Sequence, residues 1–167
     1  MDGAIPYIDQ FLQWCQKYGI KAFIDIHCHK GSQNGFDNSG QAMLLKWTSN
    51  LTMYPAGLVT FEHWPVRTAH WLGDYNVYLN KYPNINDAHI QHSLEVVRII
   101  TEKYKNNPAV LGLEPVNEPW EMSPMPVLKQ FYWDAFLIVK SIAPHWKFFI
   151  HDSFRFSPYF WGGFMAK

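Results

Sequence analysis

The sequence predicts an α/β fold with parallel strands, and three observations support this prediction. Helical and β-prone segments alternate along the 167 residues. Their order is helix, strand, helix, strand, helix, strand, which implies strands joined by helical crossovers. Each strand ends in polar or ionisable residues: His27, then Asn117 with Glu118, then His151 with Asp152. Ligands of α/β folds lie beyond the carboxyl ends of the strands, so these endings are the candidate site.

Three segments carry the apolar periodicity of amphipathic helices, namely residues 5–18, 86–104 and 127–142. In the first segment, Pro6 suits the first turn and Gly19 suits the stop. In the second, Asn86 or Asp87 is the expected cap. Apolar side chains recur at spacings of three and four in each segment, so one face of every helix is expected to pack on the core.

The predicted strands are residues 21–27, 110–113 and 147–153, which are short runs rich in β-branched, aromatic and other apolar side chains. The first strand is followed by KGSQNGFDNSG, which is a loop by composition. Residues 41–83 carry scattered Trp, Tyr and His without a clean period. An excursion of that length in a compact domain is often functional.

Composition excludes several classes of protein. Fourteen basic and fourteen acidic residues cancel, and no long run of either sign occurs, so no nucleic acid or anionic membrane partner is expected. There is no apolar stretch of membrane-spanning length, and MDGAIPYIDQ lacks the features of a signal peptide. Cys15 and Cys28 are too few for a disulfide scaffold and fit two buried thiols. The abundant aromatic rings fit either a large core or stacking platforms for sugar rings.

Residue chemistry leaves two interpretations open at each candidate position. Glu118 is either a loop carboxylate or an acid placed for catalysis, and His27 is either a hydrogen-bonded core residue or a site residue. Asp37 and Asn38 are either turn formers or sugar ligands. Phe36 indicates a binding role more strongly, because a ring exposed on a glycine-rich loop does not contribute to the core.

Two segments resemble a known family. IDIHCHKGSQNGFDNSG and GLEPVNEPW are similar to the third and fourth strand ends of glycoside hydrolase family 5, in particular its fungal exo-β-1,3-glucanase branch. FFIHDSF is similar to the fifth strand of that branch. The resemblance implies that residues 1–167 are part of a cellulase-like (β/α)₈ TIM barrel, covering about strands three to five. Residues 43–84 look like an insertion relative to that branch.

The resemblance also implies an activity and roles for individual residues. The parent protein would hydrolyse O-glycosyl bonds in β-glucans, most simply β-1,3-linked and from a chain end, with retention of configuration. Glu118 would be the general acid/base, and Asn117 would hydrogen-bond the sugar 2-hydroxyl. No cofactor is implied, the substrate would be the one partner, and the location would be extracellular or in the cell wall.

Four further residues would bind the sugar. His27 would lie in the floor of the subsite, Phe36 would offer a ring at its mouth, and Asp37 and Asn38 would bind hydroxyl groups. Cys28 and His29 depart from the branch, which has small residues there, and are expected to reshape the subsite. Because a reshaped subsite would accept sugars differently, this departure from the branch bears on linkage specificity.

The resemblance places the second carboxylate, the nucleophile, at a seventh strand end outside this chain. We therefore expect the chain to be a fragment without turnover of its own. Three carboxylates could substitute, namely Glu114, Glu121 and Asp152. Glu114 would lie about 13 Å from Glu118 along an extended chain, too far for a retaining pair.

Two rival functions stand beside this one. His27 and His29 at a strand end, with His151 ending another strand, resemble the metal site of amidohydrolase barrels, where a metal-bound water is the nucleophile. A different class is a non-catalytic carbohydrate-binding protein that keeps the sugar-facing residues of the barrel. A nucleophilic glutamate at the seventh strand end of the parent protein would distinguish the enzyme from this class.

Overall fold

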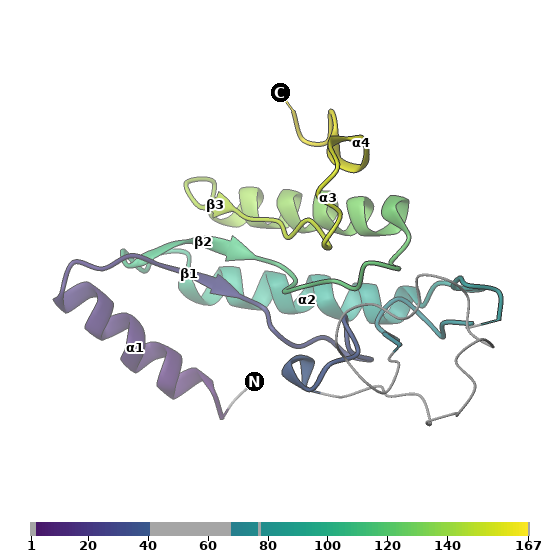
Figure 1. The fold of residues 1–167 in the computed structure, drawn as a ribbon. Coiled ribbons are helices and arrows are strands. Elements are labelled where there is room, and N and C mark those ends of the chain that lie inside the picture. Colours follow the sequence, from purple (N-terminus) through teal and green to yellow (C-terminus); the bar gives the residue numbers. More distant parts are fainter. Residues whose placement is uncertain (1–2, 41–67, 77, 167) are drawn as a thin grey trace.

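The computed structural model describes residues 3–40, 68–76 and 78–166, which form a three-stranded parallel sheet with its helices (Figure 1). The strands are β1 (Ala22–Asp25), β2 (Val110–Glu114) and β3 (Lys147–Phe148), in the spatial order β1-β2-β3. The helices are α1 (Ile5–Lys17), α2 (Asp87–Tyr104), α3 (Met125–Ile142) and the short α4 (Pro158–Trp161), with a 3₁₀ turn η1 (Asp37–Ser39). The predicted alternation and the parallel pairing are both confirmed.

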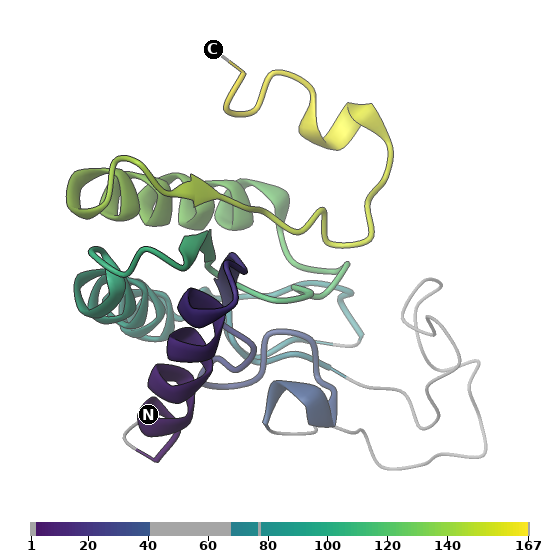
Figure 2. The ribbon, with the colours of Figure 1, turned by 90° about the vertical axis from the view of Figure 1, so that its left-hand side faces the viewer.

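Neighbouring strands in the sheet are also neighbours in the sequence, and the crossovers lie on one side. α2 connects β1 to β2 and α3 connects β2 to β3. Both views show α2 and α3 side by side on the same face of the sheet (Figures 1 and 2). A sheet that adds strands in sequence order under a single layer of helices is the wall of a (β/α)₈ barrel.

The core fills the space between the sheet and these two helices. Its apolar side chains from α2, β2, α3 and the described part of the long excursion include Leu94, Val97, Ile100, Leu113, Leu128, Phe131, Val139, Trp71 and Leu72. Each fully buried side chain of this size stabilises the fold by about 1.5–3 kcal/mol. The predicted α2 face is confirmed, because Leu94, Val97 and Tyr104 are buried and Ile90 packs partly on the core.

Helix boundaries follow the local chemistry. Asn86 is the N-cap of α2, and its side-chain oxygen accepts a hydrogen bond from the His89 N–H, which resolves the choice between Asn86 and Asp87. α3 begins at Met125, two residues before the predicted start, with a proline in its first turn. α1 ends at Lys17 and buries Leu12 and Cys15.

Several expectations are wrong in detail. β3 is two residues long rather than seven, because its pairing with β2 covers only Gly112 with Lys147 and Leu113 with Phe148. Cys28 is exposed, since it follows β1 on a loop, whereas Cys15 is buried as expected. The aromatic part of the predicted α1 face, including Phe11, is exposed.

In the described part of the chain, no helix combines the length and the apolar character that crossing a bilayer requires. This agrees with the absence of a long apolar stretch in the sequence.

Gly112 gives a direct test of the sheet. A Cβ at this position would lie 2.0 Å from the backbone oxygen of Lys147 on β3, which cannot move without breaking the β2–β3 pairing. We predict that Gly112→Ala lowers the free energy of unfolding by about 3 kcal/mol or more, as overpacking against backbone does. Urea denaturation of the protein that carries this chain measures it.

Gly3→Ala is the matched control, because a Cβ there meets nothing within 4 Å. Equal stability of the two variants would contradict the close approach of β2 and β3.

Candidate active site

The carboxyl ends of β1 and β2 are held together beyond the strands themselves. The last register pair is Asp25 with Glu114. The Ile26 N–H then donates to the Glu114 carbonyl at 3.1 Å, and the Asn117 N–H donates to the Ile26 carbonyl at 3.1 Å. This continued pairing brings two predicted site residues into contact, because Asn117 Nδ2 lies 3.1 Å from His27 Nε2.

The buried amide of Gln33 ties the glycine-rich loop to both strand ends. Its Nε2 donates to the carbonyls of His27 at 2.9 Å and Asn117 at 3.0 Å. Its Oε1 accepts from the His29 N–H at 3.2 Å, and its own carbonyl accepts from the Trp120 N–H at 2.9 Å. Gln33 is completely buried, so these contacts replace the water that a buried amide would otherwise need. The sequence analysis did not identify this residue.

Glu118 lies where the chain turns away from β2. Its φ angle of 43° is in the left-handed region, which is uncommon outside glycine and is frequent at functional sites. The residue is partly buried. Asn38 Nδ2 donates to Glu118 Oε2 at 3.3 Å, so the loop after β1 reaches the carboxylate that follows β2.

Hydrogen bonds inside the glycine-rich loop fix the direction of Asn38. Asn34 Nδ2 donates to Asn38 Oδ1 at 3.1 Å, which leaves the Asn38 amide nitrogen on the side of Glu118. Ser32 Oγ and Ser39 Oγ lie 2.5 Å apart and join the two ends of the same loop. Ser32 itself adopts a φ angle of 61°. The loop is therefore an ordered scaffold for one amide.

The other residues proposed from the sequence have no direct contact with Glu118 among the described hydrogen bonds. Asp37 is exposed in η1, and Phe36 is half-buried rather than exposed, because the loop folds back at Gly35 and Gly40. His151 Nδ1 accepts a hydrogen bond from the Ser153 N–H, its ring packs edge-on against Phe154, and its carbonyl accepts from the Tyr132 hydroxyl at 2.9 Å. No contact in the described chain joins His151 or Asp152 to the Glu118 carboxylate.

His29 belongs to the core, which corrects the expectation that it reshapes the subsite. Its Nε2–H donates to the Pro115 carbonyl at 3.0 Å, and its Nδ1 faces Ser93 Oγ at 2.8 Å. The ring lies against Trp71 and the edge of Phe131. Burial lowers the pKa of His29 to about 4, so the neutral ring is the stable form.

The metal-site alternative fails on the same geometry. β1 ends at Asp25, and beyond it the His27 side chain is exposed whereas His29 is buried, so the two imidazoles do not face one site. The two nitrogens of His29 are engaged in the core, and those of His27 face Asp25 and Asn117. Among the described residues, no three His, Cys, Asp or Glu side chains form a group that could hold a metal ion.

Two carboxyl groups lie beside the site: Asp25, which sequence reasoning passed over, and Glu114, which it considered only as a substitute nucleophile. Asp25 Oδ2 lies 2.6 Å from His27 Nδ1. Glu114 is half-buried, and its pKa is raised to about 7 by burial first and then by the charges of Asp25 and Glu118, against an opposing effect of His27. The spacing Asp25-x-His27 was the available signal, because alternate residues of a strand share a face.

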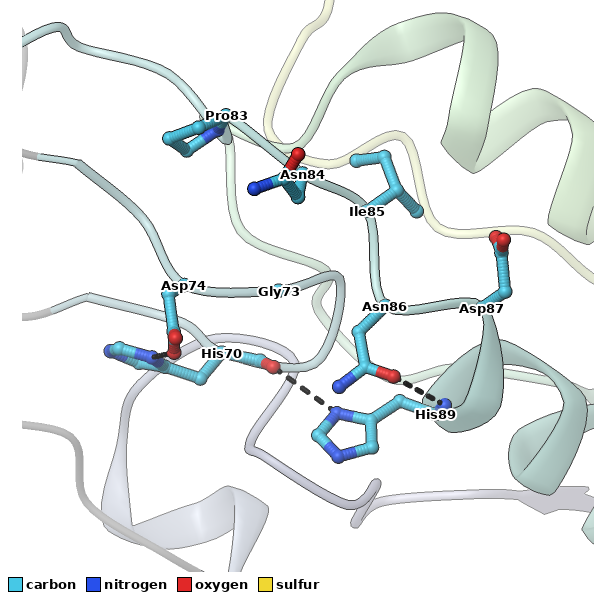
Figure 3. A pocket seen from close by; sticks show the side chains of 9 residues that line it. All are labelled: His70, Gly73, Asp74, Pro83, Asn84, Ile85, Asn86, Asp87 and His89. Atoms are coloured by element: carbon cyan, nitrogen blue, oxygen red, sulfur yellow. Dashed lines mark hydrogen bonds and ion pairs between the residues drawn. The ribbon is translucent and has the colours of Figure 1, made fainter.

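A separate hollow of about 410 Å³ lies at the start of α2 (Figure 3). His70 and Asp74 pair at 2.9 Å on one rim, and the His89 ring reaches the His70 carbonyl on the other. The residues that line it come from positions 70–74, 83–87 and 89. None of the predicted site residues is among them, so the hollow is distinct from the group around Glu118.

Comparisons with known proteins agree with this architecture. No protein-family model matches the chain. Curated relatives include glucan 1,3-beta-glucosidase of Yarrowia lipolytica, 32% identical over 96% of this chain and 30% of the relative. That of Candida oleophila is 28% identical over 99% of this chain and 32% of the relative. Glucan 1,3-beta-glucosidase 1 of Schizosaccharomyces pombe is 28% identical over 92% of this chain and 30% of the relative.

A solved structure shares the fold. Endo-glycoceramidase II from Rhodococcus sp., in a cellobiose-like isofagomine complex, matches with a TM-score of 0.53 and 16% identity. The match covers 90% of this chain and 37% of that one. At this identity the likeness bears on the fold.

The fold and the strand-end site define the chain as part of a (β/α)₈ barrel. Its homologues are glucan 1,3-beta-glucosidases, at 25–32% identity over most of its length, which confirms the resemblance seen in the sequence. The chain spans about a third of the length of the curated relatives that it matches from end to end.

The buried state of His29 predicts a pH dependence of stability. An unfolded histidine binds a proton below about pH 6.5, whereas folded His29 binds one only near pH 4. The unfolded state therefore binds more protons between these values, and stability is lost as the pH falls. We predict that His29 accounts for a loss of about 3 kcal/mol between pH 6.5 and 4.

Urea denaturation across this pH range checks the prediction, by comparing the wild type with His29→Gln. The variant should lose this part of the pH slope, and the exposed His145→Gln should keep it. An unchanged slope in His29→Gln would be the contrary result.

Proposed function

We propose that the protein that carries this chain is a retaining glycoside hydrolase that acts on β-glucans, with Glu118 as its general acid/base. The observation that supports it best is the position of Glu118 and Asn117 at the carboxyl end of β2, in contact with Asn38 and His27 from the loop after β1. Relatives of the chain are named glucan 1,3-beta-glucosidases, which favours a β-1,3-linked substrate.

A glycosidic oxygen is a poor leaving group until it receives a proton, and a positioned carboxylic acid can supply that proton. Three features of Glu118 support this role. It is partly buried, its backbone turns it away from the strand, and Asn38 donates to one carboxyl oxygen while the other, Oε1, is the atom that can reach a substrate.

Asn117 would bind the sugar 2-hydroxyl, an interaction that strengthens at the transition state. His27 supports this role, because Nδ1 faces the Asp25 carboxylate and so carries the hydrogen. Nε2 then presents a lone pair to Asn117 Nδ2. This contact fixes which end of the Asn117 amide is nitrogen, and leaves Oδ1 to accept from a hydroxyl group.

The remaining sugar-binding roles are part of the same proposal. Asp37 and Asn38 would bind hydroxyl groups and Phe36 would offer part of its ring, from a loop that begins beside His27. Residues 43–84 would be an insertion beside this loop, and most of that stretch lies outside the described residues. An extracellular or cell-wall location would suit a β-glucan substrate, as would action from a chain end.

The nucleophile of the proposed mechanism would lie outside this chain. A retaining pair needs its second carboxyl about 5–5.5 Å away and ionised. Glu114 is poorly suited, because its raised pKa of about 7 keeps a proton on it at the acidic to neutral pH at which Glu118 must donate. The proposal therefore leaves turnover to the whole protein.

Glu118→Gln tests the proposal in the full-length protein. Gln keeps the size and the hydrogen bond from Asn38 but cannot give a proton. We predict that turnover of laminarin-type oligosaccharides falls by about 10²–10⁴-fold, as expected for loss of a general acid. Substrates with activated aryl leaving groups should lose much less in their first step. Steady-state and burst kinetics on both substrate types measure this.

The exposed Glu102→Gln on α2 is the matched control and should keep wild-type activity. Wild-type turnover by Glu118→Gln would refute the assignment. Oligosaccharide binding with no turnover in the wild type would instead favour the non-catalytic carbohydrate-binding class.

A further inference from the structure

The pair of carboxyl groups under the site lies on the face of the sheet opposite the helices. Leu113 is fully buried in the core that α2 and α3 cover, and successive side chains of a strand alternate between faces. Glu114 therefore points to the other face, and so does Asp25, its register partner on β1. Two acidic side chains at neighbouring positions on one face repel each other when both are ionised.

Each carboxyl group has a different environment. Asp25 Oδ2 lies 2.6 Å from His27 Nδ1 and accepts a hydrogen bond from that ring nitrogen. The pKa of Glu114 is raised to about 7 by burial, by Asp25 and by Glu118, with His27 opposing. The proton of the pair is thus held by Glu114.

One oxygen of Asp25 lacks the partner that its burial requires. Asp25 Oδ1 is buried and accepts no hydrogen bond from the described residues. A buried carboxylate oxygen without a donor costs several kcal/mol, so a donor is expected there. A protonated Glu114 is a donor on the adjacent strand, at the same register and on the same face.

We propose that Glu114 is a positioning residue, whose protonated carboxyl group donates a hydrogen bond to Asp25 Oδ1 and keeps its proton, and that this keeps His27 as the neutral tautomer protonated at Nδ1. The relay then runs from Glu114 through Asp25 and His27 to Asn117, whose amide faces the sugar. The meaning of its last step rests on the proposed function, whereas the location of the proton does not.

Loss of the Glu114 proton would change the far end of the relay. Two carboxylates beside His27 favour the imidazolium form, in which Nε2 also carries a hydrogen. Nε2–H cannot accept from Asn117 Nδ2, so the Asn117 amide must turn and offer its oxygen to His27 instead. Asn117 Oδ1 is then no longer available to the substrate.

Other ionisable groups lie close enough to influence the charge of Glu114. Asp25, His27 and Glu118 act on Glu114 from β1 and from the two loops that follow the strands. Tyr132 on α3 is nearby, and its pKa is raised well above its ordinary value by burial, with smaller effects of Glu114, Asp152 and Asp25. Tyr132 therefore stays neutral over the relevant pH range and adds no charge beside Glu114.

Nuclear magnetic resonance of the full-length protein tests the proposal without using activity. With ¹³C-labelled glutamate carboxyl groups, we expect the Glu114 signal to titrate near pH 7. With ¹⁵N-labelled histidine, we expect His27 to be protonated at Nδ1 and bare at Nε2 below that pH. The signals are assigned by their loss in Glu114→Gln and His27→Gln. A Glu114 signal that titrates near the ordinary value of about 4.3, or a His27 ring with its hydrogen on Nε2, overturns the proposal.

Glu114→Gln and Glu114→Leu form a matched pair. Gln keeps an N–H donor for Asp25 Oδ1 at every pH, so His27 should keep its tautomer through pH 8. Leu removes the donor, and we expect the tautomer to be lost and kcat to fall by about tenfold, with KM less affected. Equal His27 spectra for the two variants contradict the relay, provided that both keep the wild-type circular dichroism.

These outcomes separate the two proposals. If Glu114 titrates near pH 7 but Glu118→Gln keeps full turnover, the relay stands and the proposed function fails. If Glu118→Gln is inactive but Glu114 titrates as an ordinary glutamate, the proposed function stands and the relay fails.

Discussion

The site depends on the buried hydrogen bonds that join the ends of β1 and β2. Backbone pairing continues past both strands through Ile26 and Asn117, and the Gln33 amide donates to the carbonyls of His27 and Asn117 at once. Gln33 is completely buried, so any separation of the two ends would leave its donors unsatisfied at a cost of about 1–3 kcal/mol each. The position of Glu118 follows from this constraint, since it is the next residue along the chain.

The two faces of the sheet differ in role: one packs on the core, and the other carries ionisable side chains. The face covered by α2 and α3 is apolar and holds Leu113. The opposite face carries Asp25 and Glu114 at one register position. His27 and His29 show the same division: the first is half-exposed beside Asn117, and the second is buried on Ser93 and Trp71 with a pKa near 4. Ionisable groups on the open face can change charge without exposing the core to water.

The sequence was sufficient for the order of the main elements and for three residues of the candidate site. Periodicity located three helices and three strands, and the cap preference narrowed the start of α2 to Asn86 or Asp87. The strand-end rule named His27, Asn117 and Glu118, which the structure brings into one group with Asn38. These features are local, or follow from parallel pairing, and so can be read from short segments.

Features that depend on register and on loop closure could not be read in that way. His29 was expected at the subsite, but its ring lies in the core against Ser93 and Pro115. Gln33 was not identified from the sequence, because its role is to donate to two carbonyls that are more than 80 residues apart in the chain. Asp25 and Glu114 act on each other only because the register of β1 and β2 places them side by side.

The central claim is that Glu118 protonates the leaving group and is not the nucleophile. Glu118→Ala, supplied with an activated β-glucoside and azide, tests it most directly in the full-length protein. If Glu118 is the acid/base, the glycosyl-enzyme still forms and azide attacks from the face that Glu118 leaves open, which gives the β-glucosyl azide. We predict that product, together with restored turnover. An α-glucosyl azide would make position 118 the nucleophile, and full activity without azide would remove it from the mechanism.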